Sequence, residues 1–255
     1  MRYRWLSLLA FFAVGLTALA QQAPTSQPPA PQLDPNNKLD ATLLNWEKAM
    51  SSLNSLYTEV KRQTTDKVLL SIDNFTGEAR YMKPNKASLY LKNDKKPADF
   101  EYLILNAQNA YKFEPSKKEI HIYTLPPAKN GQLSDENFVS MLFGMKAAEA
   151  KRRYDMQLTK EDQWYLYIQV LPRETQDKAD FTRAELVLTK STSMPRRIWF
   201  ENPNGNETTW EFTKLQPNVQ FNKSDFDQPV PPKDWQLKRV ATPEQQGPRV
   251  VRPQQ

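Results

Sequence analysis

The first regular pattern of apolar residues along the chain predicts a helix. These residues recur at spacings of three and four, which places them on one stripe of an amphipathic helix of about four turns. The stripe consists of Leu39, Leu43, Trp46, Met50, Leu53 and Tyr57.

From Leu56 onward the apolar period changes to two, which is typical of strands. The segments are short and are bounded by Asn, Asp, Gly or Pro. Asn204-Gly205 lies between two alternating runs and is the strongest hairpin signal. The turns favour an α+β fold, mostly antiparallel β, with one strongly curved or partly closed sheet. We predict eleven strands, over 56–64, 74–83, 86–93, 100–106, 109–114, 118–125, 154–160, 163–172, 181–190, 195–202 and 206–215.

Several of these strands are apolar or aromatic on both faces. The alternation over 164–171 gives two largely apolar sets, and the same holds for 102–105 and 120–125. A sheet with one face in water would not show this pattern. Two interpretations follow: helices pack on one face and some aromatic residues are exposed on the other, or one face lines an apolar cavity.

A second helix is predicted over 134–145. Ser134 can cap it, and Asp135 and Glu136 fall in its first turn, where the helix dipole favours negative charge. The preceding stretch contains Gly131, which could serve as a hinge. The helix is either ordinary core or a lid over a hydrophobic cavity. Its apolar face consists of Phe138, Met141, Leu142 and Met145.

The first twenty residues have the form of a secretory signal peptide. Arg2 and Arg4 precede an uncharged apolar run over 6–19, and Ala18-Leu19-Ala20 is a small-x-small cleavage site. We therefore expect a soluble protein that is exported to the periplasm or secreted. The chain contains no cysteine, so we expect neither disulfides nor an acylated N-terminal cysteine as a lipid anchor.

Composition also predicts the domain organisation. Residues 21–37 are rich in Pro and Gln, and 240–255 are similarly polar, so both are expected to be disordered. Between them, 38–239 should form a single domain that is large enough to fold without cross-links.

The residues offer little catalytic chemistry. The chain has one histidine, His121, and six glycines. Common zinc sites need three or four ligands of the His, Cys or carboxylate type, and no nucleotide-binding or nucleophile motif is present. The carboxylate pairs Glu161-Asp162 and Asp225/Asp227 could serve a glycosidase, but they are better explained as solvated turns. We expect no enzyme, metal or cofactor. Because the net charge of +6 is dispersed, we also expect no nucleic-acid binding.

Three motifs, taken in order, resemble a known family. The strand end Gly77–Asn85 fits the pattern G-x-x-x-x-x-K/R-P-N, and the hairpin Asn106–Pro115 fits D/N-G-x-x-x-W/Y-x-Y/F-x-P except that Ala107 replaces the glycine. A segment at Phe226–Pro232 closes the layout. The chain resembles the LolA-like family of periplasmic outer-membrane lipoprotein carriers. The resemblance implies a half-barrel whose concave face is covered by helices, with a cavity for acyl chains.

The chain departs from the family at the position that ties the lid helices to the sheet. The family has an arginine before Pro-Asn, whereas this sequence has Lys83, which lacks the planar donor fork of arginine. Arg80 is near in sequence, but strand alternation places it on the opposite face from Lys83, Ala79 and Tyr81. Lys83 and Arg80 are the two candidate latch residues.

These observations lead to one main hypothesis and two alternatives. The main hypothesis is a monomeric, soluble, non-enzymatic carrier or binder of lipid or lipidated protein, for which a membrane receptor in the cell envelope is a further conceivable partner. The alternatives are an envelope sensor of the same fold and a secreted interaction module with a fully packed core. The candidate cavity residues are Tyr81, Leu89, Leu91, Tyr102, Ile104, Ile120, Ile122, Leu166, Ile168, Ile198, Phe200, Trp210 and Phe212.

Overall fold

A computed structural model describes residues 31–125 and 145–240. The predicted signal peptide, most of the predicted linker, nearly all of the tail and all of the helix predicted over 134–145 except Met145 lie outside these ranges. None of the described helices is long and apolar enough to cross a membrane.

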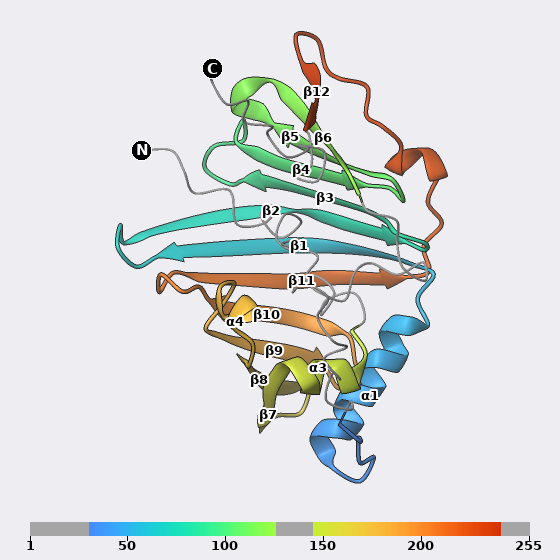
Figure 1. Cartoon of the computed structure of the whole chain (residues 1–255), viewed down its shortest axis with the longest axis vertical. Coiled ribbons are helices and arrows are strands. Elements are labelled where there is room, and N and C mark those ends of the chain that lie inside the picture. Colours follow the sequence, from blue (N-terminus) through green and yellow to red (C-terminus); the bar gives the residue numbers. More distant parts are fainter. Residues whose placement is uncertain (1–30, 126–144, 241–255) are drawn as a thin grey trace, which may run out of the picture.

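One twelve-stranded sheet forms the body of the molecule (Figure 1). Its strand order is β12-β6-β5-β4-β3-β2-β1-β11-β10-β9-β8-β7, and neighbours are antiparallel except for the parallel pair of β12 and β6. The strands are β1 (Ser55–Asp66), β2 (Ser71–Met82), β3 (Lys86–Asn93), β4 (Phe100–Leu105), β5 (Asn109–Glu114), β6 (Glu119–Thr124), β7 (Tyr154–Glu161), β8 (Tyr165–Pro172), β9 (Arg183–Thr189), β10 (Pro195–Glu201), β11 (Glu207–Pro217) and β12 (Gln236–Val240). The predicted α+β class with a curved, mostly antiparallel half-barrel sheet is confirmed.

A glycine permits two neighbouring strands of the sheet to approach closely. The backbone of β2 at Gly77 approaches β3 so closely that a Cβ atom there would lie 1.8 Å from the carbonyl oxygen of Tyr90. Only glycine fits such an approach without a backbone shift.

Two helices pack together on one face of the sheet, which we call the helix-bearing face (Figure 1). Helix α1 (Lys38–Ser51) begins at Asn37, whose side chain accepts hydrogen bonds from the backbone N–H of Leu39 and Asp40. The prediction extended this helix to Tyr57 and was wrong beyond Ser51, because Leu53 lies in the loop and Tyr57 in β1.

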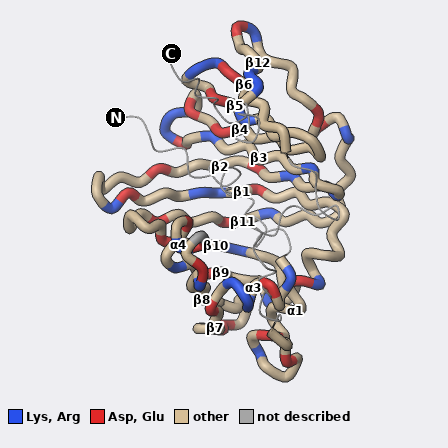
Figure 2. The backbone as a smooth tube through the Cα atoms, in the orientation of Figure 1, with Lys and Arg blue, Asp and Glu red and all other residues tan. Residues whose placement is uncertain are grey.

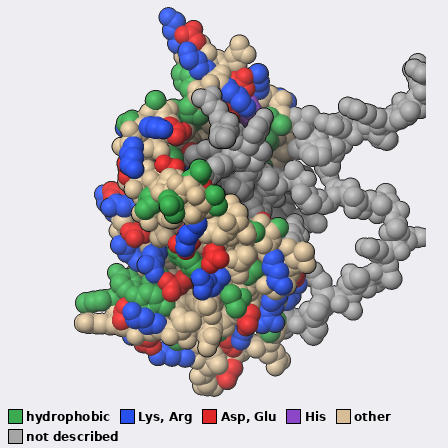
Figure 3. All heavy atoms as spheres, turned by 90° about the vertical axis from the view of Figure 1, so that its left-hand side faces the viewer, with side chains coloured by type: hydrophobic (Ala, Val, Ile, Leu, Met, Phe, Trp, Pro, Cys, Tyr) green, Lys and Arg blue, Asp and Glu red, His purple; other side chains and the backbone are tan. Residues whose placement is uncertain are grey.

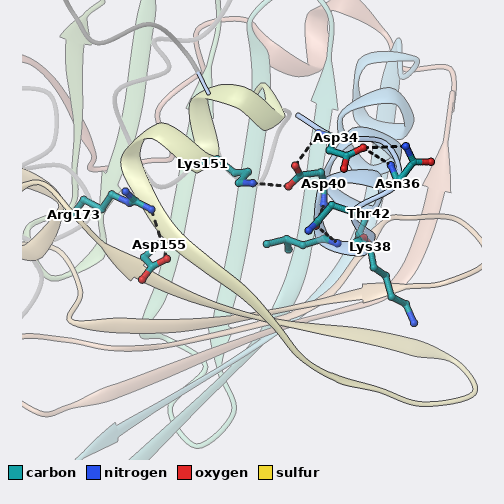
Figure 4. A network of polar contacts seen from close by, with 10 residues as sticks. Asp34, Asn36, Lys38, Asp40, Thr42, Lys151, Asp155 and Arg173 are labelled. Atoms are coloured by element: carbon teal, nitrogen blue, oxygen red, sulfur yellow. Dashed lines mark hydrogen bonds and ion pairs between the residues drawn. The ribbon is translucent and has the colours of Figure 1, made fainter. Parts of the chain in front are cut away.

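Helix α3 (Ala147–Arg153) is held against α1 by polar contacts. The Glu47 carboxylate accepts a hydrogen bond of 2.9 Å from the backbone N–H of Ala147, at the start of α3. Lys151 Nζ lies 2.6 Å from Asp40 Oδ1, and Asp40 also accepts from the backbone N–H of Asp34 (Figure 4). The two helices therefore form one unit. The other helical turns of the described residues are α4 (Thr175–Lys178), η2 (Pro115–Lys117) and η4 (Lys223–Phe226).

The opposite face of the sheet is partly covered by residues 218–235, which we call the C-terminal segment. This segment includes η4 and leads into β12 at the edge of the sheet. Phe221, Phe226 and Trp235 from it pack on apolar residues of β4, β5 and β6. The sheet therefore has apolar clusters on both faces, and the second face is covered here by an extended segment rather than by the helices α1 and α3.

Candidate functional site

The strand register decides which predicted cavity residues share a face. Directly opposed residues of an antiparallel pair lie on the same side of the sheet. Phe75 opposes Arg62, Arg62 opposes Trp210, and Trp210 opposes Ile198, whose face carries the helices. Followed across all strands, the register places nine of the thirteen on the helix-bearing face: Tyr81, Leu89, Leu91, Leu166, Ile168, Ile198, Phe200, Trp210 and Phe212.

Five of these nine belong to an apolar cluster whose described members all lie on strands. We call it the concave cluster, and it lies beside the helix-packed core on β1, β2, β3, β10 and β11. Phe200 and Phe212 belong to both and make the two continuous. The cluster consists of Val60, Phe75, Ala79, Leu89, Leu91, Phe200, Trp210 and Phe212.

The other four residues of this face pack in the core under helix α1. Ile168 and Ile198 are fully buried there, and Tyr81 and Leu166 are half-buried. Met145, the last residue of the predicted lid helix, is also fully buried in this core. The other candidate lid residues, Phe138, Met141 and Leu142, lie outside the described ranges.

The remaining four predicted residues lie on the opposite face, away from α1 and α3. They are Tyr102, Ile104, Ile120 and Ile122, and they pack beneath the C-terminal segment in an aromatic group. The Phe113 and Trp235 rings of this group are 5.8 Å apart. The sequence pattern wrongly grouped these four residues with the other nine. Alternation gives the two faces of one strand, but it does not show which of them lies on the same side of the sheet as a given face of the next strand. The pairing of Leu89 with Leu103 puts Leu103 and Leu105 on the helix-bearing face instead.

An ion pair between a buried arginine and a half-buried glutamate borders the concave cluster, and the sequence pattern did not predict it. Arg62 on β1 makes a bidentate contact with Glu101 on β4 across the two intervening strands, with Nη1 2.8 Å from Oε2. The guanidinium lies 4.4 Å from the ring centre of Phe75 and 5.3 Å from that of Trp210. Burial raises the pKa of Glu101, and the hydrogen bond from Arg62 opposes that rise. The Arg62–Glu101 pair thus places a charged contact at a fixed position beside the apolar cluster.

The two candidate latch residues bind different parts of the chain. Lys83 Nζ donates to the carbonyl oxygen of Ser51 at 2.6 Å, at the C-terminal end of α1, and its backbone N–H donates to the carbonyl of Asn54. Arg80 lies on the opposite face, as strand alternation predicts, with its guanidinium 2.6 Å from Glu78 and 3.9 Å from Asp225. Lys83 therefore fastens α1 to the sheet, whereas Arg80 faces the C-terminal segment.

The carboxylates considered for catalysis are engaged in turns and ion pairs. Asp162 accepts from the backbone N–H groups of Trp164 and Tyr165, and these bonds hold its pKa below the usual range. Hydrogen bonds from Lys190 and Lys38 lower the pKa of Glu161 in the same way. A general acid at neutral pH needs the opposite shift. These contacts are those of stabilised turns.

Polar side chains surround two hollows that open on the face opposite to the helices. One, of about 500 Å³, is lined by residues that include Arg183, Arg197 and Trp199, and a second lies over β1 and β2. None of the thirteen predicted cavity residues lines either hollow. Lys/Arg and Asp/Glu are spread over most elements of the described chain (Figure 2), with one short basic run at the end of α3, Lys151-Arg152-Arg153.

No protein-family model matches the sequence, and no curated protein matches it. Among solved structures, the chain is similar to an uncharacterized conserved protein from Thermus thermophilus, with 12% identity, a TM-score of 0.49 and coverage of 78% of this chain and 98% of that one. It is similar to the LolA superfamily protein NE2245 from Nitrosomonas europaea, with 10% identity, a TM-score of 0.35 and coverage of 74% and 97%.

It is also similar to the MucA/MucB complex structure from Pseudomonas aeruginosa, with 13% identity and a TM-score of 0.42, where the match covers 75% of this chain and 61% of that chain. All three matches have TM-scores below 0.5. They concern the fold and say nothing of what this chain binds.

Proposed function

We propose that this chain is a non-enzymatic carrier or binder of lipid or lipidated protein that acts outside the cytoplasm. In this proposal the acyl chains lie against the concave cluster. The observation that carries it is that the described members of this cluster all lie on strands, directly beside the core that α1 covers. Leu89, Phe200 and Phe212 in it are only half-buried.

The physical basis is the transfer of methylene groups out of water. Each CH₂ that leaves water contributes about 0.8 kcal/mol, so a chain of about twelve methylenes gains on the order of 10 kcal/mol before ordering costs. The cluster suits such a ligand because its half-buried members are apolar and lie beside its buried aliphatic and aromatic residues. The half-buried members are Ala79, Leu89, Phe200 and Phe212. Carboxylates held in turns and ion pairs support a binding role rather than acid–base catalysis.

Native mass spectrometry of the naturally processed protein, purified from the cell envelope, tests the proposal. We expect an added mass that corresponds to lipid or to a lipidated protein. Protein that is ligand-free and also fails to bind a hydrophobic dye would contradict the proposal. A co-purifying protein without lipid would favour an interaction module instead.

Two adjacent residues of β3 provide a matched pair of variants. Leu89 belongs to the concave cluster, whereas Tyr90 points to the opposite face and contacts Phe100 and Tyr102. Both are half-buried. Leu89→Gln should lower lipid retention about tenfold, because it places an amide against the acyl chain. Tyr90→Gln should leave retention unchanged, with folding of both variants checked by circular dichroism. Equal loss in the two variants would argue for a general effect on folding.

A further inference from the structure

The β1–β2 hairpin carries exposed aliphatic residues at its end. Its turn, residues 67–70, joins Asp66 to Ser71, and we call residues 67–72 the hairpin tip. Val68, Leu69 and Leu70 are 80%, 67% and 88% exposed, and Ile72 is 47% exposed. The tip projects beyond the neighbouring hairpins in Figure 1, and hydrophobic side chains gather at the surface on that side in Figure 3. Exposed apolar groups of this kind mark contact sites more often than isolated exposed residues do.

The backbone of the tip adds an independent observation. Leu70 has a φ of 50°, in the left-handed region that branched and bulky side chains rarely adopt. Among the described residues with positive φ other than glycine, the others are Asn85, Lys118, Ser193, Asn218 and Asp234. Leu70 is therefore the sole aliphatic residue of that set. A leucine at this position costs free energy in its backbone conformation and in the exposure of its side chain to water. We infer that the residue is there for a contact rather than for the stability of the fold.

Hydrogen bonds hold the turn in this conformation. Asp66 Oδ1 accepts from the backbone N–H of Val68 at 2.9 Å and of Leu69 at 3.0 Å. The backbone N–H of Lys67 donates to Asn206 Oδ1 at 3.0 Å, which ties the tip to the β10–β11 turn. Both anchoring side chains are buried. The aliphatic side chains are thus presented outward by a fixed turn, so little ordering entropy is lost when they are buried by a partner.

We propose that the hairpin tip inserts into the surface of a lipid bilayer. Its side chains are aliphatic and protrude from a convex end, a shape that suits the acyl boundary of a membrane. Lys67 within the tip is paired with Glu207, so the tip brings little unpaired positive charge. Insertion should therefore depend on apolar burial rather than on anionic lipid. This proposal goes beyond the acyl-chain site and does not require it.

Vesicle co-sedimentation of the naturally processed protein tests the proposal. The probes are vesicles of phosphatidylcholine and the same vesicles with added phosphatidylglycerol. We expect binding to both, with similar partition coefficients. Each aliphatic side chain removed from the tip should lower the partition coefficient by about tenfold. Any contribution from the apolar run over 6–19 cancels, because every variant is processed in the same way as the wild type.

Leu70→Asn separates a membrane role from a structural one. Asparagine tolerates positive φ, so this change should raise the stability of the fold while it weakens vesicle binding. The triple change V68S/L69S/L70N should abolish binding. Val230, which is 89% exposed in the C-terminal segment, supplies the control Val230→Ser, expected to bind as wild type.

Three results would overturn the proposal: no vesicle binding by the wild type, undiminished binding by the triple variant, or equal loss in Val230→Ser. A wild-type dimer that the triple variant dissociates, seen by analytical ultracentrifugation without vesicle binding, would assign the tip to a second copy of the chain. Loss of bound lipid in Leu89→Gln with normal vesicle binding would concern the acyl-chain site alone, so the two proposals fail separately.

Discussion

At the residue scale, the close approach of β2 to β3 depends on Gly77. A Cβ atom there would lie 1.8 Å from the Tyr90 carbonyl oxygen, which is backbone and cannot rotate away as a side chain can. Gly77→Ala should therefore destabilise the fold by about 2 kcal/mol or more, as overpacked sites do. Urea denaturation followed by tryptophan fluorescence measures the loss. Because Gly77 opposes Leu91 in the concave cluster, the same variant should also bind less lipid.

Gly205 provides the control for this prediction. It has a positive φ of 79°, and a Cβ atom there would meet no atom within 4 Å. Gly205→Ala should therefore cost only the backbone strain, about 1 kcal/mol. Equal losses for the two variants would show that close packing at Gly77 is unimportant.

The alternation of apolar residues selected nine residues that share the helix-bearing face, but it did not predict the Arg62–Glu101 ion pair on that face. Leu89 and Leu91 are two residues apart in a strand-like segment, so the alternation places them on one face. Arg62 and Glu101 are far apart in the sequence and belong to strands that are not neighbours in the sheet. Their contact depends on register and curvature, and neither can be read from local alternation. Arg62 follows Val60 by two residues and therefore lies on the same face of β1. A charged residue at such a position is the one sequence signal that could have indicated the ion pair.

At the scale of elements, Lys83 fastens helix α1 to the sheet. Its ammonium group donates to the carbonyl of Ser51, where the helix ends and the dipole favours a positive charge. Lys83→Met should therefore cost about 0.5–1 kcal/mol and speed hydrogen exchange in the last turn of α1. Lys83→Arg should restore most of the protection.

Lys92, an exposed lysine of β3, supplies the matched control for this change. Lys92→Met should leave exchange in α1 unchanged. If Lys83→Met also leaves the last turn of α1 as protected as in the wild type, the contact contributes nothing to fastening the helix.

Elements with a strong period were predictable, and those fixed by tertiary pairing were not. The eleven predicted strands correspond to β1–β11, because each combines alternation with a turn signal. Strand β12 was missed, since Gln236–Val240 is exposed, charged and short, and exists through parallel pairing with β6. Helix α3 was also missed, since its start is set by the Glu47 side chain from α1 rather than by its own sequence.

At the scale of the whole molecule, the two faces of the sheet have separate apolar clusters. The core beneath α1 and the cluster beneath the C-terminal segment share no residue. Phe226 is fully buried in the second cluster, where it packs edge-on against Phe221. The separation predicts that a substitution which destabilises one cluster lowers hydrogen-exchange protection mainly in the strands that contribute to that cluster.

Phe226→Ala tests this separation. Loss of the buried ring should cost about 3–4 kcal/mol, as large-to-small substitutions in cores do. Hydrogen exchange followed by mass spectrometry should accelerate in β4, β5, β6 and β12, whereas β7–β10 should keep their protection. Uniform acceleration would mean that the sheet unfolds as one unit. Because the concave cluster lies on the other face, Phe226→Ala at a temperature where it remains folded should still retain lipid, in contrast to Leu89→Gln.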